Sequence, residues 1–160
     1  MKRTYVAIRR SVVCTLLAAL FVGAALAQEP TPLIIVTSVV AGHENNTPEL
    51  TCVQTSRFRH EEQVVWRAKI IDPATGEEMA DDVLEYVRVI LPDGETFDMG
   101  FGPHPSRDPV DEYWTLDWVI PADYPSGVLD YDIVAVALDG RTGKNVVFPI
   151  ESSMLTILPE

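Results

Sequence analysis

Residues 63–71 read Gln-Val-Val-Trp-Arg-Ala-Lys-Ile-Ile, and apolar side chains recur there at every second position. Successive side chains of an extended chain point to opposite faces, so Trp66 shares one face with apolar neighbours while Arg67 and Lys69 lie on the other. This alternation predicts a β-strand with one buried face. Residues 72–76, Asp-Pro-Ala-Thr-Gly, end the strand in a turn, because proline fixes φ and glycine tolerates positive φ.

On both sides of residues 63–71, further short apolar segments are separated by residues typical of turns. We expect strands at residues 33–40, 86–91, 96–99, 113–120, 128–138, 146–148 and 154–158. Residues 92–95, Pro-Asp-Gly-Glu, predict a hairpin turn, and residues 139–143 predict another tight turn. A short strand is possible at residues 50–53. Residues 78–85 could form either a helical turn or an edge segment, and the sequence does not decide between them. Residues 100–112, with three prolines, are expected to be irregular.

About seven short strands at intervals of roughly ten residues are typical of an antiparallel β-sandwich. Trp114 and Trp118 fall on one face of their segment, and Tyr131 lies among apolar residues of another. Aromatic side chains of this size need a second layer to cover them. We therefore expect an all-β fold and assign these residues, with Trp66, to a core between two sheets.

The first 27 residues have the parts of an export signal. Four basic residues stand among the first ten, an apolar run follows at 12–26, and Ala25-Leu26-Ala27 has the small-x-small form of a cleavage site. We predict a helical signal peptide at 1–27, cleaved after Ala27, and one mature domain at 28–160 that is periplasmic or secreted. A bilayer span needs about 20 apolar residues, so no span is expected to remain.

The export route has two alternatives. Arg9-Arg10-Ser11-Val12-Val13 resembles the twin-arginine signal, but Ile8 stands where Ser or Thr is usual and two valines replace the common Phe-Leu. Basic residues before an apolar core also belong to every general secretory signal, which is the favoured interpretation.

Composition narrows the choice of partners. Cleavage would leave all 24 acidic residues and 8 of the 12 lysines and arginines, changing the net charge from −12 to −16. Nucleic acids and anionic membranes select basic patches, so neither is expected as a partner. Cys14 would leave with the signal peptide, so Cys52 has no partner for an internal disulfide. We favour a buried, inert Cys52 over an exposed thiol open to an intermolecular bond.

Residues 58–76 and 123–137 resemble two segments of bacterial extracytoplasmic immunoglobulin-like or fibronectin-type modules. Residues 58–76 are similar to the second strand and following turn of such modules, and residues 123–137 to the penultimate strand, in which Gly127 and Tyr131 match a starting glycine and an early tyrosine. The chain lacks the cysteine pair of antibody domains, and Glu61 stands where a turn glycine is frequent. The resemblance implies an immunoglobulin-like β-sandwich with an adhesive, scaffolding or subunit-docking role. Because a fold alone does not determine an activity, it implies no catalytic reaction.

Residues 99–113 are the candidate binding surface, because long loops often carry function and prolines lower the entropy lost on binding. The candidate partner-binding residues are Phe101, His104, Arg107, Asp108, Asp111 and Glu112. An edge strand with unpaired backbone is a second candidate surface. The alternative is that this loop only connects the two sheets.

Metal ligands are further candidates. Four aspartates offer the hard oxygen ligands that calcium prefers: Asp72, Asp130, Asp132 and Asp139. No twelve-residue calcium loop contains them, and a solvated acidic face explains them as well. Met99 and His104 could bind copper, although their spacing fits no established motif. We expect no cofactor, with calcium and copper as the open alternatives.

The sequence predicts no catalytic residues, because no nucleophile, base and orienting group fall into a recognisable pattern. We therefore expect an exported, non-catalytic module that contacts a partner protein in adhesion, scaffolding or subunit docking. The alternative is a small ligand- or metal-ion-binding accessory subunit of an exported redox or transport system.

Overall fold

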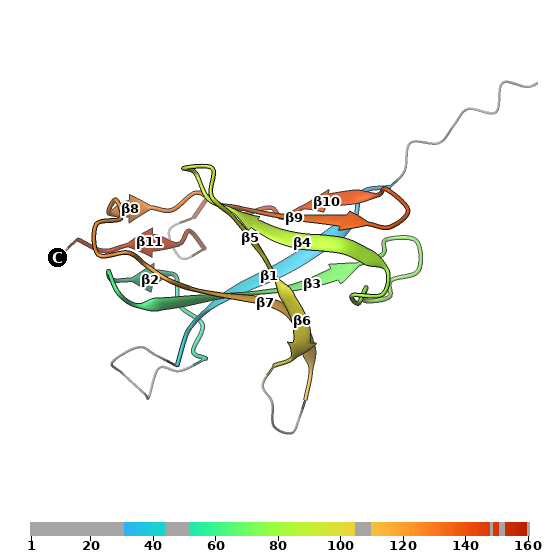
Figure 1. Cartoon of the computed structure of the whole chain (residues 1–160), viewed down its shortest axis with the longest axis horizontal. Coiled ribbons are helices and arrows are strands. Elements are labelled where there is room, and N and C mark those ends of the chain that lie inside the picture. Colours follow the sequence, from blue (N-terminus) through green and yellow to red (C-terminus); the bar gives the residue numbers. More distant parts are fainter. Residues whose placement is uncertain (1–30, 44–51, 105–109, 148, 151–152, 160) are drawn as a thin grey trace, which may run out of the picture.

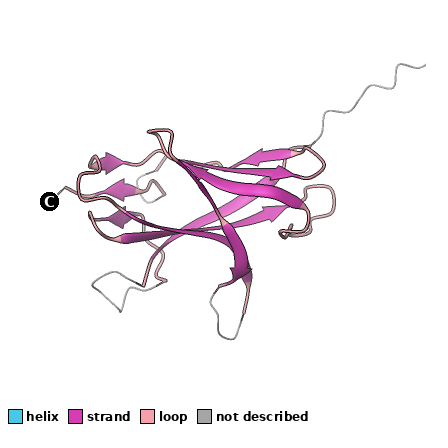
Figure 2. Cartoon of the chain, viewed as in Figure 1, coloured by secondary structure: helices cyan, strands magenta, loops and turns pink. Residues whose placement is uncertain are grey.

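The described part of the chain consists of β-strands joined by loops and turns (Figures 1 and 2). The computed structural model describes residues 31–43, 52–104, 110–147, 149–150 and 153–159. These residues form eleven strands and no helix, which confirms the prediction of an all-β chain. Accordingly, none of them belongs to a helix long and apolar enough to cross a membrane. The predicted signal peptide and its cleavage site lie outside the described residues.

Eight strands form two four-stranded antiparallel sheets, which Figure 1 shows as two layers. The first sheet contains, in spatial order, β1 (Ile34–Ala41), β3 (Gln63–Ile71), β7 (Glu112–Val119) and β6 (Gly100–Pro103). The second sheet contains β10 (Thr142–Lys144), β9 (Asp132–Ala137), β4 (Leu84–Ile90) and β5 (Thr96–Asp98). The chain crosses from the second sheet to the first at Met99, which is buried between β5 and β6.

A third, smaller sheet lies at the end of the molecule near the C-terminus (Figure 1). It contains β2 (Arg57–Phe58), β11 (Thr156–Ile157) and β8 (Gly127–Val128). β11 runs parallel to β2 and antiparallel to β8, so one pair departs from the antiparallel expectation. Phe58 and Ile157 are buried, and this sheet therefore extends the core.

One hydrophobic core joins the inner faces of the sheets. Trp66 of β3 is fully buried, and its ring lies 5.5 Å from the ring of Tyr131, which precedes β9. Trp114 of β7 is buried as well. The core assignments of Trp66, Trp114 and Tyr131 are confirmed. Trp118 is only half-buried, with its ring 5.8 Å from Trp66 and 5.2 Å from Tyr124.

The positions of strands in which buried and exposed side chains alternate regularly were predicted correctly. β3 has the predicted bounds, and its alternate residues are buried from Val64 to Ile70. β1 and β7 lie within one residue of their predicted positions. The predicted hairpin turn joins β4 to β5, with Gly94 at a φ of 92°.

Residues 128–138 do not form the single long strand that their alternation predicts. β8 ends at Val128 and β9 begins at Asp132. Between them the Leu129 N–H donates to the Leu155 carbonyl at 2.8 Å, which draws this part of the chain to the third sheet.

Three shorter strands also differ from the prediction. Residues 142–144 form β10, whereas Val146 and Val147 are not in a strand and Phe148 lies outside the described residues. β6 occupies a segment predicted to be irregular, and β2 lies where no strand was predicted. Each of these strands has two to four residues, too few to establish a period.

Glu61 adopts a left-handed backbone conformation, with a φ of 64°, in the turn before β3. An L-residue there costs about 1–2 kcal/mol that glycine avoids, partly offset by the greater entropy of glycine in the unfolded chain. We expect Glu61→Gly to raise the free energy of unfolding by about 0.5–1 kcal/mol, measured by thermal or urea unfolding.

The neighbouring glutamate supplies a matched control. The Glu62 carboxylate accepts a hydrogen bond from the Arg59 N–H at 2.7 Å, so Glu62→Gly should lower stability. A Glu61→Gly protein that melts at or below the temperature of the parent would contradict the strain argument.

Candidate partner-binding hairpin

β6 and β7 form a hairpin that projects from the body of the two sheets (Figure 1). Pairing continues to Pro103, which lies opposite Glu112. Beyond the strands, the His104 N–H donates to the Asp111 carbonyl at 2.7 Å. We call the paired part of this hairpin, residues 100–104 and 111–115, the stem. Its two sides are held together along this whole length.

The structure places four of the six predicted partner-binding residues on this hairpin. They are Phe101, His104, Asp111 and Glu112. The other two, Arg107 and Asp108, lie outside the described residues. Glu112 and Asp111 are exposed, whereas His104 and Phe101 are half-buried.

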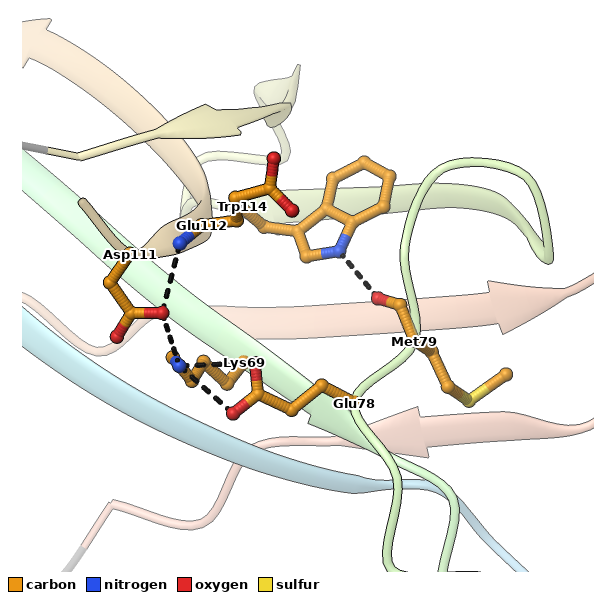
Figure 3. Close-up of polar contacts among 6 residues, drawn as sticks. All are labelled: Lys69, Glu78, Met79, Asp111, Glu112 and Trp114. Atoms are coloured by element: carbon orange, nitrogen blue, oxygen red, sulfur yellow. Dashed lines mark hydrogen bonds and ion pairs between the residues drawn. The ribbon is translucent and has the colours of Figure 1, made fainter. Parts of the chain in front are cut away.

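Aromatic packing fixes the root of the hairpin. Gly100 and Gly102 flank Phe101, whose ring lies 5.2 Å from that of buried Trp114. The Trp114 Nε1–H donates to the Met79 carbonyl at 3.2 Å, as Figure 3 shows. Phe101 therefore supports the hairpin from the core side. Met99, one of the two residues considered as possible copper ligands, is buried.

Lys69 of β3 joins the stem to the segment that follows β3 (Figure 3). Its Nζ donates to the Asp111 Oδ1 at 2.8 Å and to both carboxylate oxygens of Glu78 at 2.9 and 3.0 Å. The hydrogen bond to Asp111, followed by that to Glu78, raises the pKa of Lys69 well above its ordinary value. The same contact lowers the pKa of Asp111. At neutral pH the lysine is therefore charged and held between two carboxylates.

Tyr113 lies beneath two cations. Lys69 Nζ is 4.8 Å from the centre of its ring, and the Arg67 guanidinium carbon is 5.4 Å from it. Both distances are within the range of cation–π attraction, about 6 Å. A hydrogen bond with Asp111 and burial raise the pKa of the Tyr113 hydroxyl, so it stays protonated. The base of the stem is thus surrounded by a fixed group of one ring, two cations and two carboxylates, Asp111 and Glu78.

His104 and Cys52 approach each other across 52 residues of sequence. The Cys52 Sγ lies 4.0 Å from His104 Nε2. Burial, and secondarily the charge of Arg67, lowers the pKa of His104, which is therefore neutral at pH 7. Cys52 is exposed, so the prediction of a buried thiol is wrong. A cysteine and a histidine could in principle bind zinc, but zinc sites in proteins use at least three protein ligands, and this pair supplies two.

The four aspartates proposed as calcium ligands do not gather at one place. Arg141 bridges two of them, with its Nη2 2.9 Å from Asp72 Oδ2 and its Nε 2.8 Å from Asp139 Oδ2. Asp132 pairs with Lys144 at 2.8 Å, and Asp130 is exposed. Across the described ranges, no three His, Cys, Asp or Glu side chains form a group able to hold a metal ion.

Arg141 gives Asp72 and Asp139 a structural role. The two carboxylates belong to the turns after β3 and β9, one from each sheet. The hydrogen bond from the Arg141 side chain lowers the pKa of Asp72, and that of Asp139 is lowered by the Arg141 N–H and side chain. The bridge therefore joins the two sheets at this end of the molecule.

Sequence reasoning missed Lys69, Glu78, Arg67 and Tyr113 as members of the hairpin group. Lys69 and Arg67 were expected only as exposed residues of a strand. The available signal was their position on the outer face of β3, since β7 pairs next to β3 and brings Tyr113 over that face. Glu78 had no such signal, because its placement depends on an isolated bridge to Ile71.

No protein family model, curated protein or solved structure matches this chain.

Proposed function

We propose that this chain is an exported, non-catalytic immunoglobulin-like module that binds a partner protein through the β6–β7 hairpin. The observation that carries the proposal is the fixed stem, in which Lys69 joins Asp111, Glu78 and the Tyr113 ring at the base of the projecting β6–β7 hairpin. A loop on a stem ordered in advance loses less entropy on binding. Exposed charges and a half-buried aromatic ring suit a polar protein interface.

The strand order supports the immunoglobulin-like part of the proposal. Constant-type immunoglobulin domains have one sheet in the order A-B-E-D and a second made of C, F and G. In spatial order, β1, β3, β7 and β6 correspond to A, B, E and D, and β4, β9 and β10 correspond to C, F and G. β5 would be the additional strand next to C, and Tyr131 would occupy the tyrosine position at the start of strand F.

The leader at residues 1–27 supports export, and the excess of acidic residues supports a soluble module that does not bind nucleic acid. The partner is therefore expected in the periplasm or outside the cell. The complex of the module with this partner would serve in adhesion, scaffolding or subunit docking.

Replacing Lys69 tests the hairpin. We expect Lys69→Met to weaken binding of the cognate partner about three- to tenfold, because the stem must then be ordered during binding. Capture of extracytoplasmic proteins by the purified chain, with cross-linking and mass spectrometry, identifies the partner. Titration of that partner then measures the dissociation constant.

Lys144→Met is the matched control, because Lys144 forms an exposed ion pair with Asp132 on the second sheet. It should bind the partner like the parent. Equal affinity of both variants and the parent, or failure to recover any single partner, would contradict the proposal.

A further inference from the structure

β1 is the longest of the four strands at the edges of the two main sheets. It has eight residues, whereas β6 has four and β5 and β10 have three each. Short strands and proline protect sheet edges from pairing with other chains, and β6 has both features. β1 has neither, so its free side is the edge best suited to receive another strand.

The outer side of β1 is closed at both ends. The Leu33 N–H, just before β1, donates to the Thr142 carbonyl at 2.9 Å. At the other end the Val39 carbonyl accepts from the Thr55 N–H at 3.3 Å, and the Ala41 N–H donates to the Val53 carbonyl at 2.9 Å. Odd-numbered residues of β1 therefore direct their backbone groups away from β3.

The middle of this edge is open. By the same alternation, the N–H and C=O groups of Ile35 and Thr37 point away from β3. Within the described part of the chain, neither residue has a backbone hydrogen bond on that side. Two donors and two acceptors thus remain in the arrangement that an extended segment would complete.

A groove of about 710 Å³ runs along this open stretch. Residues 35–39 of β1 line it, together with residues 54–57, Val146, Val147 and Ser153, and the buried Tyr131 and Leu155. Among the described residues, Asn145 is the last to pair with β9, donating its N–H to the Ile133 carbonyl at 2.9 Å, and Val146 and Val147 continue outside any strand. Two exposed valines, Val36 at 54% and Val146 at 80%, lie in this lining beside polar residues such as Thr55 and Arg57.

We infer that this groove binds an extended segment of a partner polypeptide, which adds to β1 opposite Ile35 and Thr37. The segment would be apolar at every second residue, because alternate side chains of an added strand would point between the sheets toward Tyr131 and Leu155. This inference rests on the proposed function and names a second contact for the same kind of partner.

Two observations favour a partner segment over a second copy of this chain. The open stretch is bounded at each end by chain that is already paired, so a narrow extended peptide fits better than the edge of another folded sheet. In addition, two mature copies, each with the net charge of −16 that the predicted cleavage would leave, repel one another. The same charge selects a neutral or basic segment.

A display library of random nine-residue peptides, selected against the purified protein, tests the inference. Selected peptides should be apolar at alternate positions and should slow hydrogen exchange of the Ile35 and Thr37 amides. Thr37→Pro should weaken their binding about tenfold or more, because it removes an outward N–H and obstructs the edge. Thr37→Val keeps the backbone groups and should retain binding. Peptides N-methylated at the pairing amides should bind poorly even if Thr37→Pro does not fold.

Other outcomes would overturn the inference. Peptides that bind Thr37→Pro as well as the parent but lose affinity for Lys69→Met would locate binding at the hairpin, which refutes the groove and leaves the proposed function standing. Unchanged exchange at Ile35 and Thr37 with bound peptide would refute it too. A dimer in sedimentation that protects those two amides would show that a second copy occupies the edge.

Discussion

Replacing Trp66 with alanine is expected to lower the free energy of unfolding by about 3–5 kcal/mol. The side chain is fully buried on β3, in the middle of the first sheet, and its ring contacts those of Trp118 and Tyr131. Removing it leaves a cavity between the sheets that the surrounding strands cannot fill. A typical domain is stable by only about 5–15 kcal/mol, so this one change would remove a large share.

Urea unfolding followed by far-ultraviolet circular dichroism measures the loss. Trp118→Ala is the matched control, since the same residue type lies half-buried on the same sheet and should cost clearly less. Trp66→Phe keeps an aromatic ring and removes a buried Nε1–H that forms no hydrogen bond of good geometry with the described residues, so it too should cost less than Trp66→Ala. Equal losses for Trp66→Ala and Trp118→Ala would contradict a core centred on Trp66.

The fold could be predicted where a strand is long enough for its alternation to appear. β3 was predicted at its observed bounds because nine residues alternate and a proline turn ends them. Residues 128–138 alternate as well, yet the contact of Leu129 with Leu155 divides them. That contact joins segments distant in sequence, and no local pattern reports it. The very short strands β2, β6 and β10 depend on pairing in the same way.

The candidate site was predictable only in part. Proline content and charge identified the loop that contains His104, Asp111 and Glu112. Lys69 and Tyr113 could not be assigned to it from local sequence, because the register of β3 against β7 brings them together. The proximity of Cys52 and His104 likewise depends on how two segments 52 residues apart are placed.

Gly143→Ala is expected to lower the free energy of unfolding by about 1–3 kcal/mol, because it overpacks the contact between β10 and the start of β1. A Cβ at Gly143 would lie 2.6 Å from the Leu33 carbonyl oxygen, which is too close for any real contact and belongs to the backbone. The start of β1 must then move away from β10, and the hydrogen bond from Leu33 to Thr142 weakens.

Two measurements separate this mechanism from a general loss of stability in Gly143→Ala. Thermal unfolding should show the lower stability, and the Leu33 amide should exchange faster than amides at the centre of β3, because the displacement begins at that contact. Gly102→Ala is the matched control, since Gly102 also lies in a strand and its Cβ would meet no atom within 4 Å. It should change stability by no more than about 0.5 kcal/mol. If Gly143→Ala melts like Gly102→Ala, the close approach of β1 to β10 does not limit the fold, and the closed end of the groove along β1 would have to be reconsidered.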